Sequence, residues 1–205
     1  MIHAQLRPIL DFTRHKALEM NNIDLSYELL AHIPEFPLRK LKPHAKTADE
    51  LVELLLEYEL ENIRVIVDKE FKDENAIDDI LQASQEIAKE FDNIFPSLLP
   101  QIKQKYPMLY HDQFQKRIDL ISKKIRYNLD QGIAQGLYRS DFSSELISRL
   151  YLSRLIDIHN QEYFPSASFS FDVLFNQMFG NLIRSIATPK GLAHFEEQLS
   201  LYSQQ

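Results

Sequence analysis

Apolar residues recur along this chain at intervals of three and four over most of its length, and no segment reads as a run of alternating strands. This period places apolar side chains on one face of an α-helix, whereas a half-buried strand would show a period of two. The pattern therefore predicts an all-α protein. Long helices are expected within residues 47–67, 76–95, 114–137, 144–158 and 169–187, with a short terminal helix after Pro189.

Local signals indicate where some of these helices begin and end. Thr47 and Glu50 have the spacing of a capping box, in which the threonine and glutamate side chains bind free backbone amides at a helix start. Pro96, Pro100 and Pro107 interrupt the periodic pattern, because proline lacks an amide donor and disfavours helical geometry before it. We therefore expect the chain to turn between residues 96 and 107.

The chain has only four glycines, and two of them, Gly132 and Gly136, lie four residues apart in a helical segment. A glycine within a helix costs roughly 1 kcal/mol relative to alanine, so its presence there suggests a specific structural need. The spacing predicts close packing against the backbone at Gly132 and the end of the helix at Gly136.

The segment around these glycines resembles the ligand-binding domain of TetR-family transcriptional regulators. The resemblance covers roughly residues 75–200. It rests on the run Asn-Leu-x-x-Gly-Ile-x-x-Gly-Leu-Tyr-Arg at 128–139, on Leu146, Leu150 and Tyr151, and on Ile-Ala-Thr-Pro-Lys-Gly at 186–191. It implies a C-terminal domain that binds a small-molecule effector and dimerises, joined to a helix-turn-helix that binds operator DNA.

The first 46 residues match the family's helix-turn-helix in part. A helix containing Leu6, Ile9, Leu10, Phe12 and Leu18 is followed by a second at 26–31, a proline-rich turn, and a basic segment at 39–42. Ser26 stands where the family has a capping threonine, Leu41 at a leucine of the recognition helix, and Lys46 at the lysine that opens the next helix. The resemblance thus predicts a three-helix DNA-binding-like module at 1–46 and a ligand-binding and dimerisation domain at 47–205.

Several positions depart from the family pattern. Glu35 replaces the turn glycine, Pro37 replaces a capping serine, and Lys42 replaces a tyrosine. A side chain at Glu35 disfavours positive φ, and prolines at 37 and 43 leave only about six residues for a recognition helix. Two readings follow: a DNA-binding regulator, or a dimeric small-molecule- or protein-binding module whose helix-turn-helix is vestigial.

The distribution of charge bears on this choice. The whole chain carries a net charge of −7, but residues 1–48 contain seven basic and five acidic residues, which leaves −9 for the remainder. A small local excess of positive charge is compatible with a DNA-facing patch and also with an ordinary solvated surface. The DNA-contacting candidates are Arg39, Lys40, Lys42, His44 and Lys46, with Arg39 the best placed to contact a guanine edge.

Aromatic residues cluster on the segments that surround the effector in the resembled family. The candidate ligand-binding residues are Phe91, Phe95, Tyr110, His111, Phe114 and Tyr127. Apolar walls with a few phenol or imidazole groups suit an amphipathic or aromatic ligand, but each ring taken by itself is also interpretable as part of the core. Asn128 is expected either to cross-link helices or to touch the ligand.

The last long helix has more apolar surface than one neighbouring helix would cover. Such a surface typically marks an interface, and the resemblance implies an intermolecular four-helix bundle. The alternative is burial within the same subunit. The homodimer interface is expected to contain Leu150, Phe171, Phe175, Met178, Phe179 and Leu182.

Other functional classes have no positive support. The chain has no cysteine and none of the common phosphate-loop, dinucleotide, nucleophile-elbow or metalloprotease motifs. We therefore expect no enzyme activity, catalytic residue, metal or cofactor. The chain shows no leader sequence and no apolar run long enough to span a membrane, which predicts a cytoplasmic protein without a membrane partner.

Overall fold

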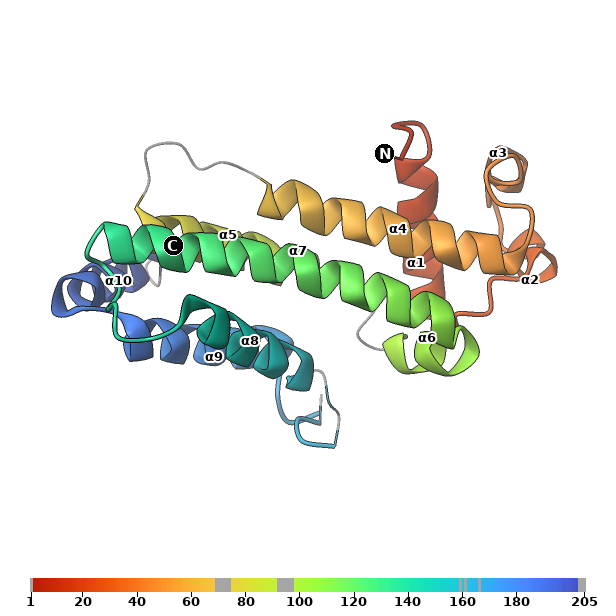
Figure 1. Ribbon diagram of the computed structural model, residues 1–205. Helices are drawn as coiled ribbons and strands as arrows, with labels where there is room; N and C mark the ends of the chain where they lie inside the picture. The colour runs from red at the N-terminus through yellow and green to blue at the C-terminus, as the bar shows by residue number, and fades with distance from the viewer. Residues whose placement is uncertain are drawn as a thin grey trace. The chain divides into compact units, whose positions relative to one another are not determined.

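The computed structural model describes residues 2–68, 75–91, 98–158, 160, 162–165 and 167–202. Within these ranges it has ten helices and no strand, which confirms the predicted all-α class (Figure 1). The helices are α1 (Arg7–Glu19), α2 (Tyr27–Ala31), α3 (Leu38–Leu41), α4 (Ala48–Val67), α5 (Ala76–Phe91), α6 (Leu99–Lys105), α7 (Pro107–Ala134), α8 (Ser144–Asp157), α9 (Phe171–Ile186) and α10 (Pro189–Tyr202).

The chain forms two compact units. The N-terminal unit comprises residues 1–65 and 93–117, and the C-terminal unit comprises residues 66–92 and 118–205. The chain thus passes from one unit to the other within α4 and again within α7. This division differs from the expected boundary at 46/47, because the first turns of α4 bury Leu51, Val52 and Leu55 in the N-terminal unit.

Helices α2 and α3 contact each other within the N-terminal unit and are joined by residues 32–37. The Ser26 hydroxyl accepts a hydrogen bond of 3.3 Å from the Leu29 amide at the start of α2. Leu30 of α2 and Leu41 of α3 are fully buried, and Ala45 after α3 is also buried. Ser26 therefore caps α2, and Leu30 and Leu41 are core positions of this unit.

The turn between α2 and α3 contains a residue with strained backbone geometry. Glu35 has φ of 61°, in the left-handed region where a side chain is disfavoured. Asn21, in the turn after α1, is the only other non-glycine with positive φ among the described residues. The chain thus adopts at Glu35 the geometry for which the family uses glycine.

Replacing Glu35 with glycine should raise the free energy of unfolding by about 1 kcal/mol, because glycine adopts positive φ without steric cost. Urea denaturation followed by circular dichroism measures the change. Asn21→Gly is the matched control: its φ is 47°, but asparagine tolerates this region, so the gain should be smaller. A loss of stability in Glu35→Gly would contradict the assigned strain.

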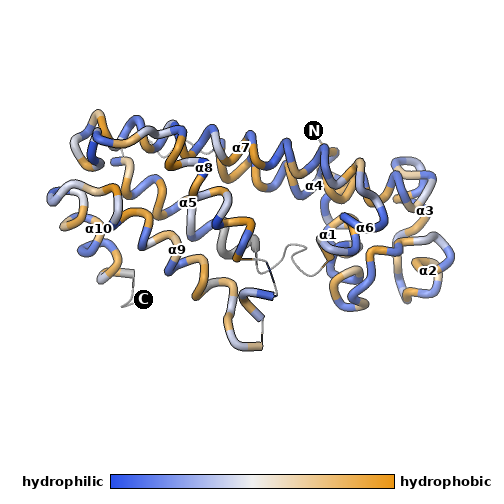
Figure 2. Tube along the Cα trace, turned by 60° about the horizontal axis from the view of Figure 1, so that its bottom comes forward, coloured by the Kyte–Doolittle hydropathy of each residue, from blue (hydrophilic) through white to orange (hydrophobic). Residues whose placement is uncertain are grey.

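Helices α5, α8, α9, α10 and the later part of α7 build the core of the C-terminal unit. Helix α5 contacts α9 and α10, and α9 contacts α8. Hydrophobic residues dominate α9 (Figure 2). The fully or almost fully buried side chains at the centre of this core are Ile77, Leu129, Tyr138, Phe175, Ile183 and Phe195.

The end of α7 follows the prediction made from its two glycines. Gly136 has φ of 70°, and the amides of Gly136 and Leu137 donate to the carbonyls of Ile133 and Gly132 at 3.0 and 2.8 Å. These two bonds define a Schellman motif, which ends a helix with a left-handed residue. A Cβ atom at Gly132 would lie 2.1 Å from the Tyr138 ring, so the predicted close packing is confirmed.

Candidate functional site

The first candidate site is the exposed surface of α3 and of the segment that follows it. Arg39 and Lys40 are exposed on α3, and Lys42, His44 and Lys46 are exposed in the segment that leads to α4. None of the four Lys and Arg side chains has an ion-pair partner among the described residues. Cations without a protein counter-charge are available to bind phosphate. The structure therefore gathers the predicted DNA-contacting residues on one short stretch of surface.

Helix α3, to which the resemblance assigns the role of recognition helix, is very short. Helix α3 has four residues, so it rises only about 6 Å and directs just Arg39 and Lys40 outward. Tyr27 of α2 fixes the segment that follows, because its hydroxyl donates to the Ala45 carbonyl and its ring lies 5.7 Å from the Lys42 ammonium. Burial raises the pKa of Tyr27, which keeps this donor protonated. Such a surface offers more phosphate contacts than base contacts.

The second candidate site is a cavity inside the C-terminal unit, with a volume of about 30 Å³. Most of its wall is apolar, and the polar side chains on it are Ser84, Lys124 and Tyr151. The other lining residues are Val67, Ile80, Ala83, Ile121, Ile125, Leu155, Phe175 and Phe179. An apolar cavity with a few polar groups is the usual form of a small-molecule site.

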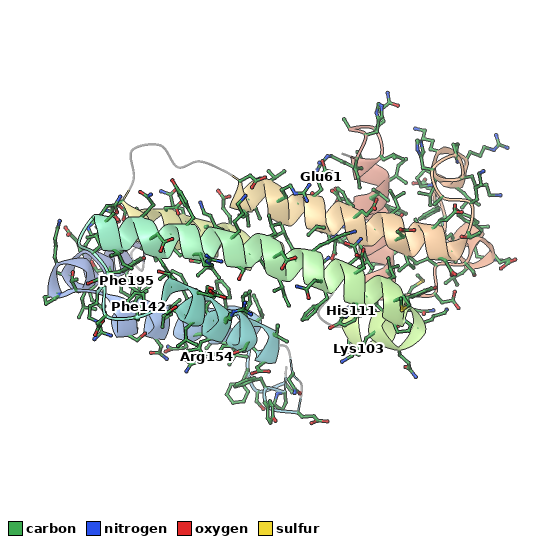
Figure 3. The ribbon with its side chains drawn as sticks, viewed as in Figure 1. Glu61, Lys103, His111, Phe142, Arg154 and Phe195 are labelled. Atoms are coloured by element: carbon green, nitrogen blue, oxygen red, sulfur yellow. The ribbon has the colours of Figure 1, made fainter. Side chains whose placement is uncertain are left out.

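The residues predicted to bind the ligand do not line this cavity. Tyr110, His111 and Phe114 belong to the N-terminal unit. The centroids of the stacked Tyr110 and Phe114 rings lie 5.4 Å apart. His111, which Figure 3 labels, is exposed. Tyr127 is exposed on α7. The side chains of Phe91 and Phe95 lie outside the described residues. Among the described residues, the candidate ligand-binding residues therefore do not meet at this cavity, and their role in ligand binding stays a prediction.

The residues predicted to form the dimer interface divide into two groups. Leu150 is exposed, and Phe171 and Leu182 are half-buried against the core. Phe175, Met178 and Phe179 are buried within their own unit, and the assignment of the six residues to a dimer interface stays a prediction. A charge introduced at Phe175 or Phe179 would therefore disrupt the fold itself. The exposed apolar side chains of α8, of the segment before α9 and of the start of α9 are Leu146, Leu150, Ile156, Phe169 and Val173.

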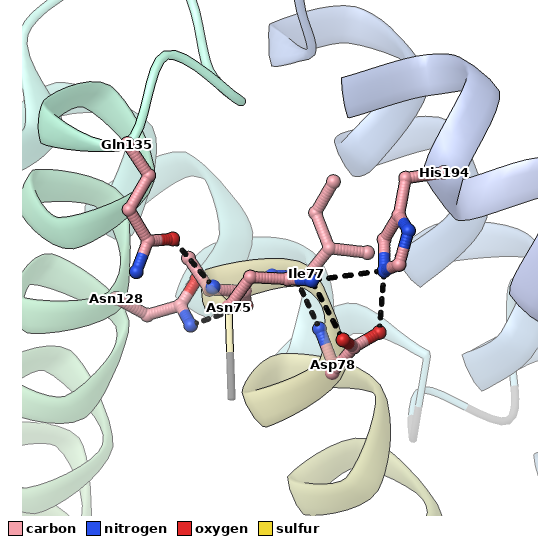
Figure 4. Close-up of polar contacts among 7 residues, drawn as sticks. Asn75, Ile77, Asp78, Asn128, Gln135 and His194 are labelled. Atoms are coloured by element: carbon pink, nitrogen blue, oxygen red, sulfur yellow. Dashed lines mark hydrogen bonds and ion pairs between the residues drawn. The ribbon is translucent and has the colours of Figure 1, made fainter. Parts of the chain in front are cut away.

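Asn128 cross-links helices. Its side-chain amide donates to the Ala76 carbonyl at 2.7 Å and to the Asp79 carboxylate at 2.9 Å, and its oxygen accepts from the Tyr138 hydroxyl at 3.2 Å. The Gln135 oxygen accepts from the Ala76 amide at 2.8 Å (Figure 4). These bonds attach the start of α5 to the end of α7, so of the two expected roles the structure shows the structural one.

Helix α10 is attached to the same end of α5. Asn75 caps α5 by accepting from the amides of Ile77 and Asp78, each at 3.0 Å. The Asp78 carboxylate lies 2.7 Å from Nε2 of His194 on α10 (Figure 4). This network explains why polar residues lie at the edge of an otherwise apolar core.

Sequence reasoning missed the polar residues of the cavity. Tyr151 belongs to the buried face of α8, four residues before Leu155, and has the sequence signal of an ordinary core position. For Lys124 the sequence contained a weak indication of a polar group at the core. This charged residue directly precedes Ile125 in the apolar repeat of Ile118, Ile121 and Ile125 on α7. Its ammonium lies 2.9 Å from the Asp79 carboxylate, which explains how the charge is accommodated.

Comparison with known proteins finds no matching family model and no matching curated protein. Within the described part of the chain, no helix combines the length and the apolar character needed to cross a membrane.

Proposed function

We propose that this protein is a dimeric, ligand-responsive transcriptional regulator of the TetR type. The observation that carries the proposal is the helix-turn-helix, in which Ser26 caps α2, Leu30 and Leu41 form its core, and Arg39 and Lys40 are exposed on α3. The cavity of the C-terminal unit supports an effector site. The exposed apolar residues Leu146 and Leu150 of α8 support pairing with a second copy.

The mechanism of the proposal is linkage between the two sites. An effector that binds one conformation more tightly changes the free energy of DNA binding. Bound DNA changes the free energy of effector binding by the same amount, because the coupling is reciprocal. In a symmetric dimer, the two DNA-binding units would bind half-sites about 34 Å apart along one face of the duplex. The short α3 indicates that phosphate contacts supply most of this DNA affinity.

A second candidate function is a dimeric binding module that no longer contacts DNA. The observation that favours it is the length of α3, which has four residues between Pro37 and the Lys42-Pro43 pair. This candidate keeps the cavity and the exposed apolar surface but predicts no affinity for duplex DNA.

Titration of purified full-length protein against its own upstream DNA at several salt concentrations tests the proposal. Wild-type protein should bind with steep salt dependence. Lys42→Gln with Lys46→Gln should weaken binding to all sequences about equally and reduce the slope by about 0.9 for each phosphate that is no longer neutralised. Arg39→Ala should instead relax sequence preference.

The matched control is Lys123→Gln, which removes one exposed positive charge from the C-terminal unit and should leave the slope unchanged. Sedimentation of the same samples should show a dimer. If wild-type protein shows no salt-sensitive affinity for any duplex, the second candidate function replaces the first.

A further inference from the structure

The chemical character of the C-terminal cavity limits what it can bind. Its wall contains aliphatic and phenylalanine side chains and only three polar ones, Ser84, Lys124 and Tyr151. The Ser84 hydroxyl already donates to the Leu81 carbonyl at 2.7 Å. The ligand must therefore bury mostly apolar surface and make few hydrogen bonds.

Tyr151 is the polar group with unused hydrogen-bonding capacity at this cavity. Its side chain is only 7% exposed, and its hydroxyl has no hydrogen-bond partner among the described residues. Because Tyr151 lines the cavity, this hydroxyl is within reach of a ligand bound there. Burial raises the pKa of Tyr151, so the phenol stays protonated and acts as a donor. A ligand oxygen facing it would satisfy this donor.

The charges around the cavity argue against an ionic ligand. The one ionisable cation on the wall is Lys124, whose ammonium lies 2.9 Å from the Asp79 carboxylate, with both side chains largely buried. A charged ligand would have to enter an apolar cavity without a dedicated counter-charge, which is strongly unfavourable. An uncharged molecule avoids this cost.

The volume of the cavity indicates how far its walls must move when a ligand binds. A cavity of about 150 Å³ accommodates benzene, whereas this one measures about 30 Å³. A ring-sized ligand therefore has to displace part of the wall. Ile121 lines the cavity and is only half-buried, so truncating it creates space without removing a fully buried side chain.

We infer that the cavity takes a compact, uncharged, largely apolar molecule with one oxygen that accepts a hydrogen bond from the Tyr151 hydroxyl. This inference rests on the effector-binding part of the proposed function and specifies the class of effector. Small phenols and ketones have this chemistry, whereas carboxylates and organic cations do not.

Phenol and toluene provide the test, because they have nearly the same shape and differ in the hydroxyl group. Their dissociation constants are measured by NMR titration with full-length wild-type protein and with Tyr151→Phe, and again in an Ile121→Ala background that enlarges the cavity. Tyr151→Phe should weaken phenol binding about fivefold, as expected for the loss of one hydrogen bond. Toluene affinity should change by less than twofold.

The outcomes separate this inference from the proposed function. Equal changes for phenol and toluene, or unchanged phenol binding, overturn the role of Tyr151 while leaving the cavity as a ligand site. Absence of binding by both probes in both backgrounds overturns the cavity as an effector site. Neither result alters the DNA titration, which reports on the N-terminal unit independently. Thermal melts of each variant without ligand verify that it is folded.

Discussion

Replacing Gly191 with alanine should lower the free energy of unfolding by about 3 kcal/mol, the upper part of the usual range for overpacking a well-packed site. A Cβ atom at this position would lie 2.1 Å from the Leu137 carbonyl oxygen and 2.9 Å from its carbonyl carbon. Both are backbone atoms, so no side-chain rotation relieves the clash. Urea denaturation measures the loss.

The Leu137 carbonyl cannot move away cheaply, because it also accepts a hydrogen bond of 2.9 Å from the Thr188 amide. The Thr188 hydroxyl donates to the Gly136 carbonyl at 2.8 Å, and the Arg139 amide donates to the Ile186 carbonyl at 2.8 Å. Together these bonds join the end of α7 to the α9–α10 turn. Overpacking at Gly191 should therefore disturb the whole junction.

Gly180 provides the matched control within α9. A Cβ atom there would approach only the end of the flexible Arg184 side chain, at 2.8 Å. Because alanine is favoured over glycine inside a helix by roughly 1 kcal/mol, Gly180→Ala should be neutral or stabilising. Equal effects of the two substitutions would contradict the close approach at Gly191.

The helices were predictable because most of their apolar stripes are buried. The repeats within 76–95, 144–158 and 169–187 correspond to α5, α8 and α9. The repeat within 114–137 placed the end of its helix too far along the chain. Helix α7 ends at Ala134, but Leu137 after it is also buried and so continues the apolar repeat. Periodicity reports which side chains are buried, and a buried residue can also lie in the loop after a Schellman motif.

The candidate sites were harder to predict, because apolar residues have the same sequence signal in a core, a cavity wall and an interface. Phe175 and Phe179 were predicted to face a partner, yet they are buried and line the cavity. Their position depends on which helices pack against α9, which the sequence does not encode locally. The exposure of the cations on α3 was easier to predict, because Arg39 and Lys40 directly precede Leu41, whose side chain is buried while theirs are exposed.

Removing the Arg117 guanidinium should have the largest effect on stability. Its Nη2 lies 2.9 Å from Oε2 of Glu59, a carboxylate that is 0% exposed in the N-terminal unit. Removing one partner of a buried ion pair typically costs about 3–5 kcal/mol, because the remaining buried charge loses the attraction of that counter-charge. We therefore expect Arg117→Met, which keeps much of the side-chain volume, to lower the free energy of unfolding by about this amount.

Two variants show whether the loss comes from the buried charge. Glu59→Gln added to Arg117→Met removes that charge and should recover part of the stability. Arg149→Met breaks an ion pair of the same 2.9 Å length with Glu145 on α8, where both side chains are exposed, and should leave stability essentially unchanged. Two outcomes would contradict this role of the Glu59–Arg117 pair. One is that Arg117→Met is as stable as wild type. The other is that the double variant is less stable than Arg117→Met alone.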